Sequence, residues 1–257
     1  MGDNRVVTVS WITAFLDTPG ASSVEADAFW LAATGTSPSP RRGRDQRFAT
    51  LLPLDGDAFI RTQVIESGLP GVHVDLHVPD PGESAQHAAS LAASIVADHG
   101  SLVVLTSPGG RPFCLVAHRD EQVRPKPAIW LGGHRSLVDQ VCLDIPASDF
   151  DLEANFWSSL TGWPRRRGAR PEFDYLERPA TMPLRLLLQR VDGDGPVHAH
   201  LDLACDDVAA ETARHETLGG NVVRRTEAWT TLRDPAGRDY CITSRDPLSG
   251  HLAPTGS

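Results

Sequence analysis

Two histidines occupy matching places in the chain, and each is followed two residues later by an aspartate: His73 by Asp75, and His200 by Asp202. Side chains two residues apart in a strand point to the same face, so each pair would lie together if its segment is extended. A carboxylate in that place can orient an imidazole nitrogen or bind backbone, and an oriented imidazole can act as a metal ligand or a general base. His198 also shares this spacing with His200, as an alternative ligand or as a rim residue.

Two cysteines recur in the same way, Cys114 after Phe113 and Cys241 after Tyr240. Their setting is typical of a small buried side chain rather than of a nucleophile beside a base. The chain has no glycine-rich phosphate loop and no His-Glu-x-x-His, and no Ser/His/Asp arrangement is marked by local sequence. The chemistry therefore has to come from the histidines and their neighbours.

These matches belong to an internal repeat with a constant offset of 127 residues. The same offset relates Phe29-Trp30 to Phe156-Trp157 and Thr34-Gly35 to Thr161-Gly162. Gly100 and Gly220 also look equivalent although they lie 120 residues apart, which predicts a longer second helix and a shorter hairpin in the first copy. We expect domains at 6–116 and 138–243, a linker at 117–137 and a tail at 244–257.

The composition of the chain excludes several classes of protein. The 257 residues carry a net charge of −9, which argues against a protein that tracks nucleic-acid phosphates and against a polybasic membrane anchor. No apolar run is long enough to span a bilayer, and four cysteines in this length do not form a disulfide scaffold. We expect a cytoplasmic protein with reduced thiols.

The second copy divides again into two similar units. Strands are expected at 138–145, 173–177 and 184–191, with a helix from Asp149 or Asp151 to Leu160 that Gly162 ends. Within it, Leu152, Phe156 and Leu160 are expected on one apolar face. A strand at 197–204, a helix from Asp206 or Asp207 to Leu218 and strands at 222–224, 229–233 and 240–243 follow. The order β-α-β-β-β thus occurs four times in the chain, which predicts an α+β fold with two half-open, cup-shaped barrels.

At this point the sequence resembles the vicinal oxygen chelate superfamily, and within it the bacterial glyoxalase-like and bleomycin-resistance branch. The motifs that carry the resemblance are Leu143-Asp144-Ile145-Pro146, Leu187-Leu188-Gln189-Arg190-Val191, His200-Leu201-Asp202-Leu203, and Trp229 with Asp234-Pro235-x-Gly237. They cover the second half almost completely and the first half more weakly. Because the superfamily serves many reactions, the resemblance implies the fold more firmly than the activity.

The resemblance implies a metal-ligand set on the first strand of a half, the first strand of its second unit and the last strand. In the second half these positions hold Gln140, His200 and Asp239, which could bind one divalent ion such as Zn, Mn, Fe or Ni. In the first half they hold Thr13, His73 and Pro112, which are not expected to bind a metal. We favour structural histidines and no tightly bound metal over a tight catalytic site.

Aromatic and basic residues of the second half are candidate ligand contacts. Trp163, Tyr175 and Trp229 could line an apolar cavity and stack on a planar ligand, together with His198, or they could belong to the core. Trp157 is expected in the core because it recurs as Trp30. The arginines at 165–167 are expected in a solvated loop after the helix.

Three functions stay open. The first is a protein that binds a small, planar or oxygen-rich organic molecule in the second cup without tightly bound metal. The second is a divalent-metal-dependent lyase, isomerase or dioxygenase that uses Gln140, His200 and Asp239, and the third is a metal-free enzyme with His200 as general base. The expected partner is a small molecule, and the expected assembly is a monomer or a weak homodimer. The sequence does not identify the ligand.

Overall fold

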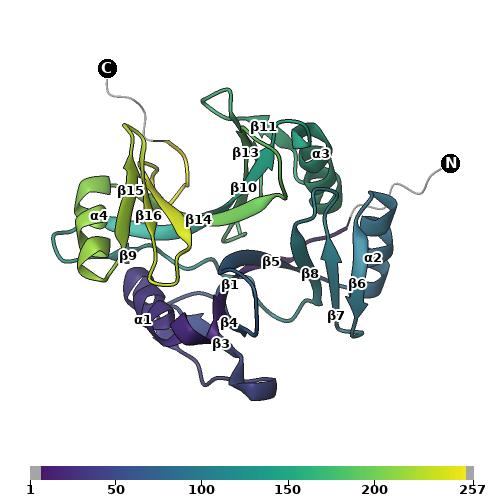
Figure 1. Ribbon diagram of the computed structural model, residues 1–257, viewed down its shortest axis with the longest axis horizontal. Helices are drawn as coiled ribbons and strands as arrows, with labels where there is room; N and C mark the ends of the chain where they lie inside the picture. The colour runs from purple at the N-terminus through teal and green to yellow at the C-terminus, as the bar shows by residue number, and fades with distance from the viewer. Residues whose placement is uncertain (1–6, 253–257) are drawn as a thin grey trace. The chain divides into compact units, whose positions relative to one another are not determined.

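The computed structural model describes residues 7–252, and the first half of the chain repeats one strand–helix–three-strand order (Figure 1). Residue 6 of the expected first domain and residues 253–257 of the expected tail lie outside the described residues. Two short 3-10 turns accompany the first βαβββ unit, at Gly20–Ser22 and Arg44–Gln46. The elements are β1 (Trp11–Pro19), α1 (Ser23–Thr34), β2 (Ser37–Pro38), β3 (Phe48–Leu52), β4 (Ile60–Ile65), β5 (Gly71–Val78), α2 (Pro81–Ser90), β6 (Ser94–Asp98), β7 (Leu102–Thr106) and β8 (Pro112–Ala117).

The second half repeats this order, after the short strand β9 (Ala128–Ile129) that pairs with the start of β10. The elements are β10 (Arg135–Pro146), α3 (Phe150–Thr161), β11 (Arg165–Arg167), β12 (Phe173–Leu176), β13 (Arg185–Val191), β14 (His198–Cys205), α4 (Val208–Thr217), β15 (Asn221–Arg225), β16 (Trp229–Arg233) and β17 (Asp239–Thr243). The expected α+β plan of four βαβββ units is confirmed. The loop expected at 165–167 is wrong: these arginines form an edge strand, where Arg166 is paired with Tyr175 of β12.

Each half forms one mixed sheet. The strand order is β2-β3-β4-β1-β5-β8-β7-β6 in the first half and β11-β12-β13-β10-β14-β17-β16-β15 in the second. The pairing of β5 with β8 is parallel, as is that of β14 with β17, whereas β7 and β16 run antiparallel to their neighbours. Asp75 lies opposite Cys114 and Asp202 lies opposite Cys241, so both copies bring the same residue types together.

The expected difference in helix and hairpin length between the copies is wrong. Helices α2 and α4 are both 10 residues long, and the strands after them keep the offset of 127. Gly220 is therefore equivalent to Ala93, and Gly100 lies in the turn between β6 and β7. At the preceding position Gly219 has a φ of 102°, and Ala92 adopts a φ of 75° in the first copy without the help of a glycine. Because alanine replaces glycine at this position, the sequence did not reveal that the two helix ends are equivalent.

Helix ends follow the local sequence. Gly35 and Gly162 end α1 and α3 in the left-handed conformation, as expected for Gly162, and Asp207 caps α4 by accepting a hydrogen bond from Ala210. The expected apolar face of α3 is partly wrong. Phe156 and Leu160 are buried, but Leu152 is 55% exposed, and Glu153 takes the buried place instead.

The described chain divides into two compact units, each of which takes residues from both halves. The first unit holds residues 7–15, His73–Val123 and Val141–Ala199. Helix α2 packs on β6, β7 and β8 (Figure 1), and Phe113 of β8 meets Trp157 of α3 with ring centroids 5.0 Å apart. The carboxylate of Glu153 accepts hydrogen bonds from Ser107 and from the Gly109 amide.

The second unit holds Leu16–Val72, Arg124–Gln140 and residues 200–252. Its core joins α1 to the β17 region: Trp30 donates its indole N–H to Asp234 at 2.8 Å, and its ring lies 5.2 Å from that of Tyr240. The expectation that Trp30 and Trp157 are core residues is confirmed, since both are at most 1% exposed. None of the helices within residues 7–252 has the length and apolar character needed to cross a membrane.

Candidate functional site

Strand β14 presents two different faces. Leu201 and Leu203 are buried at 1% exposure on one face, and the alternation of a strand places His200 and Asp202 on the other. The parallel pairing with β17 then sets Cys241 opposite Asp202, and the next strand sets Thr231 opposite Cys241. A row of polar side chains therefore crosses this part of the sheet on one face.

Within this row, the His200 group consists of His200, Asp202, Gln140 and Cys241. The Gln140 amide donates to Asp202 Oδ2 at 2.5 Å, and His200 Nε2 lies 3.3 Å from Asp202 Oδ1. The Cys241 thiol lies 3.8 Å from the same imidazole nitrogen. Asp202 is thus the centre of the group, and Gln140 and His200 are brought together through it.

The charges of this group are defined by its contacts. Burial alone would raise the pKa of Asp202, but the hydrogen bond and charge of His200, the charge of Arg245 and the hydrogen bond from Gln140 lower the pKa below its ordinary value. Burial and the charge of Asp202 raise the pKa of the Cys241 thiol. The group therefore holds a carboxylate beside an imidazole and a protonated thiol, which suits base or ligand chemistry and not cysteine nucleophilicity.

Asp239 is placed elsewhere. It is the first residue of β17, and its exposed carboxylate accepts two hydrogen bonds from Arg233, at 2.7 Å and 3.1 Å. Gln140 meanwhile turns its amide N–H, not its carbonyl, toward Asp202. Gln140, His200 and Asp239 therefore do not present three oxygen or nitrogen ligands to one ion, and the set implied by the resemblance does not fit a metal.

The other candidate ligand contacts of the second half differ in their burial. Trp229 and Tyr175 are half-buried, and each has a guanidinium over its ring, Arg224 at 5.7 Å and Arg185 at 4.8 Å from the ring centroids. Trp163 is only 4% exposed and follows directly after helix α3. His198 is exposed at the first position of β14.

The first half has an equivalent row of side chains on β5 and β8, with different contacts. His73 stacks on Phe15 with ring centroids 4.8 Å apart and an interplanar angle of 7°, and its Nε2 lies 3.7 Å from Asp75 Oδ1. Thr13 shares a hydrogen bond of 2.9 Å with His77, and Pro112 is the exposed first residue of β8. His73, Asp75 and Cys114 offer ligand atoms within 4.8 Å of one another, without Thr13 or Pro112.

Sequence reasoning missed a second histidine cluster. His77, His118 and Glu121, all in the first half, also have ligand atoms within 4.8 Å of one another. The available signal was the pattern His118-x-x-Glu121 directly after the last strand of the first half. Comparison of the two copies passed over it because the second copy has no counterpart.

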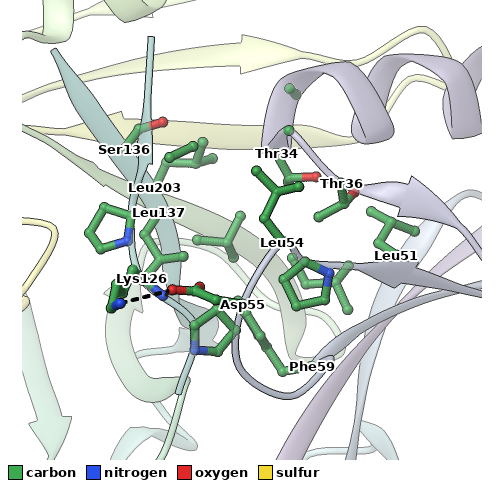
Figure 2. Close-up of a pocket in the computed structure, with 18 of the residues that line it drawn as sticks. Thr34, Thr36, Leu51, Leu54, Asp55, Phe59, Lys126, Ser136, Leu137 and Leu203 are labelled. Carbon is green, nitrogen blue, oxygen red and sulfur yellow. Dashed lines mark hydrogen bonds and ion pairs between the residues drawn. The ribbon is translucent and has the colours of Figure 1, made fainter. Parts of the chain in front are cut away.

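Sequence reasoning also missed a cavity of about 350 Å³ in the second compact unit, shown in Figure 2. Apolar side chains such as Leu51, Phe59 and Leu137 dominate its lining, and Lys126 meets Asp55 at 3.4 Å beside it. Its one lining residue from β14 is Leu203, which lies on the strand face opposite to His200. The cavity is therefore distinct from the His200 group.

Comparisons with known proteins agree with this architecture. The model of the glyoxalase-like domain matches twice, at residues 13–116 and 140–243. Solved structures with the same fold include the Mn(II)-bound glyoxalase from Novosphingobium aromaticivorans (TM-score 0.61, 14% identity, 97% of this chain and 89% of that one). Another is the 2,3-dioxygenase LapB from Pseudomonas sp. KL28 (TM-score 0.60, 14% identity, 93% of each chain). No curated protein matches the sequence. The chain belongs to the glyoxalase-like domain family and carries two copies of the domain in tandem.

Proposed function

We propose that the second half binds a small, planar or oxygen-rich organic molecule at the His200 group, without a tightly bound metal ion. The observation that carries this proposal is the buried carboxylate of Asp202, held by Gln140 beside the imidazole of His200. A buried charge is costly unless it is hydrogen-bonded. Such a group is typical of the few preorganised polar groups that orient a ligand in a binding site. His200 has a side-chain exposure of 16%, which leaves it within reach of a ligand.

The same contact supports a second candidate, a metal-free enzyme with His200 as general base. A carboxylate beside an imidazole fixes the orientation of the ring and stabilises the imidazolium that forms when the ring takes a proton. The proton would come from an O–H or an activated C–H of the bound molecule. The protonated Cys241 thiol supplies no competing nucleophile.

A metal-dependent reaction at Gln140, His200 and Asp239 is the weakest of the three candidates. One structural neighbour is described as Mn(II)-bound, but the likeness at 14% identity carries the fold and not the ligands. In this chain Asp239 is paired with Arg233, and Asp202 takes the hydrogen bond from Gln140. We therefore propose no step through a metal at these residues.

The proposal is tested by a thermal-shift screen of planar and vicinal-oxygen compounds. We expect a ligand that raises the thermal midpoint of the wild type and of His73→Asn, the matched change 127 residues earlier, but not of His200→Asn. Leu137→Trp, which fills the separate cavity, should keep the response. A response lost in Leu137→Trp and kept in His200→Asn would contradict the proposal, as would a response equal in all variants.

Turnover of the same ligand distinguishes the two supported candidates. Incubation with the wild type should leave the ligand unchanged if the protein only binds it. Conversion that is lost in His200→Asn, with the fold intact by circular dichroism, would favour the general base. Conversion at a normal rate in His200→Asn would exclude it.

A further inference from the structure

The His118 group consists of His77, His118 and Glu121, and it lies where the end of β5 meets the segment after β8. His77 is the second-last residue of β5, on the face it shares with His73 and Asp75. The His118 amide donates to the Val78 carbonyl at 2.9 Å, which holds the segment beside β5. Three side chains from two separate segments of the first half therefore converge within one compact unit.

The distances in this group match ligands around an ion. His77 Nδ1 and His118 Nδ1 lie 3.6 Å and 3.7 Å from the same oxygen, Glu121 Oε2. Both separations exceed the range of a hydrogen bond. Ligands about 2.05 Å from a tetrahedral ion lie about 3.3 Å apart, so the spacing leaves room for a metal between these atoms.

The surroundings of the group support the same reading. The side-chain exposures of His77, His118 and Glu121 are 3%, 21% and 16%, so His77 is buried and the other two ligands remain partly accessible to an ion from solvent. The fully buried Thr13 hydroxyl lies 2.9 Å from His77 Nε2. When this hydroxyl accepts a hydrogen bond from Nε2–H, it fixes the ring and leaves the Nδ1 lone pair free for a metal, as outer partners of metal-bound histidines do. His118 Nδ1 is buried and has no hydrogen-bond partner within residues 7–252.

The second half provides a comparison for this group. At the equivalent positions it has Ala204, Arg245 and Leu248, none of which completes a histidine–carboxylate set. Arg245 instead makes a buried ion pair with Asp139, whose equivalent in the first half is the apolar Ile12. The segment after the last strand is thus fixed by an arginine–aspartate pair in one copy and meets two histidines and a glutamate in the other. The His118 group is therefore particular to the first copy.

We propose that His77, His118 and Glu121 bind one divalent transition-metal ion, such as Zn²⁺ or Co²⁺. Two imidazoles and a carboxylate are ligands that these ions prefer over Mg²⁺ or Ca²⁺. Three protein ligands leave at least one coordination position for water or another small ligand. The site uses none of the residues that carry the proposed function, so either can fail without the other.

Metal titration of the full chain without a polyhistidine tag tests the site. After treatment with a chelator and its removal, Co²⁺ is added and followed by its visible absorbance, and bound ions are counted by mass spectrometry. We expect one ion per chain for the wild type, and loss of this binding in His118→Asn and in Glu121→Gln. Thr13→Val should keep one ion at saturation but weaken the affinity about 10–100-fold.

Matched variants control for other histidines and for folding. His200→Asn and His73→Asn should bind one ion as the wild type does. His118→Asn without metal should keep the circular dichroism of the metal-free wild type, while only the wild type gains thermal stability on addition of Zn²⁺. Binding of less than one ion by the wild type, unchanged binding in His118→Asn, or loss of binding in His200→Asn would each overturn the proposal.

Discussion

Gly220 follows helix α4 at a place where a side chain has no room. A Cβ atom there would lie 2.9 Å from the Tyr240 hydroxyl and 3.0 Å from the His215 carbonyl oxygen. The Tyr240 hydroxyl is fixed in turn by His215 Nδ1 at 2.9 Å. The backbone of Gly220 does not require glycine, because its φ is outside the left-handed range. The need for glycine is therefore steric.

The first copy shows which of the two contacts matters. Ala93 is equivalent to Gly220, and its amide donates to the Ala88 carbonyl at 3.0 Å, as Gly220 donates to His215 at 2.9 Å. A Cβ is thus compatible with this close backbone approach. The first copy differs in having Phe113, which lacks a hydroxyl, at the position of Tyr240. We infer that the hydroxyl excludes a side chain at Gly220.

This reasoning predicts a double-mutant cycle with a definite sign. Gly220→Ala should lower the free energy of unfolding by about 1–3 kcal/mol, the usual cost of overpacking. Tyr240→Phe should also cost about 1–3 kcal/mol, because it leaves a buried His215 nitrogen without its partner. In the Tyr240→Phe background the added methyl has more space, and Gly220→Ala should cost less than about 0.5 kcal/mol or stabilise the fold.

Urea denaturation followed by tryptophan fluorescence measures all four corners of the cycle. The free energies are compared at a common slope, and Ala93→Gly, which should cost about 0.5–1 kcal/mol, serves as the reverse change in the first copy. An equal cost of Gly220→Ala in the wild-type and Tyr240→Phe backgrounds would refute the inference about the hydroxyl. The carbonyl of His215 would then be the obstacle.

Buried ionic groups give two more expected outcomes. Arg245→Met leaves the carboxylate of Asp139, 1% exposed, without its cation, and should cost about 3–5 kcal/mol in urea denaturation; a loss under about 1 kcal/mol would contradict this. Burial lowers the pKa of His215 below 6.5, so the unfolded chain binds this proton first and stability decreases as the pH falls below 6.5. Burial raises the pKa of Glu211, but Arg214 and His215 lower it more, below 4.5, which adds a second decrease below pH 4.5. His215→Gln should remove the first decrease from the pH dependence of the urea midpoint, and an unchanged profile would disprove its origin.

Much of the fold could be predicted because it is encoded in local and repeated patterns. Strand alternation, the glycine after Thr161 and the constant offset of 127 residues each depend on short stretches of chain. The exceptions are instructive. Leu152 was expected inside by its spacing, but Glu153 is buried instead because its carboxylate accepts hydrogen bonds from Ser107 and Gly109. Those partners come from the other half of the sequence, so helical periodicity could not reveal them.

The candidate site could be predicted only in part, for a similar reason. The sequence predicts that His200 and Gln140 lie in one site. Both do contact the same side chain, which is Asp202. Whether Asp239 can reach the histidine depends on the register of β14 and β17 and on the arginine that pairs with Asp239. Neither quantity is visible in the spacing of residues. The aspartate two residues after His200 was the better guide, because strand alternation fixed its face.

The repeat reveals the residues that both copies share, but it does not reveal residues that only one copy has. Both copies have a histidine, an aspartate and a cysteine in one row. The differences lie beside this row: Thr231 of the second copy corresponds to Val104 of the first, and Arg245 corresponds to His118. The polar row of the second copy therefore reaches further toward its strand edge, whereas the first copy has additional imidazole and carboxylate groups at the end of β5. Such divergence from one strand plan favours separate roles for the two copies over a pair of identical sites.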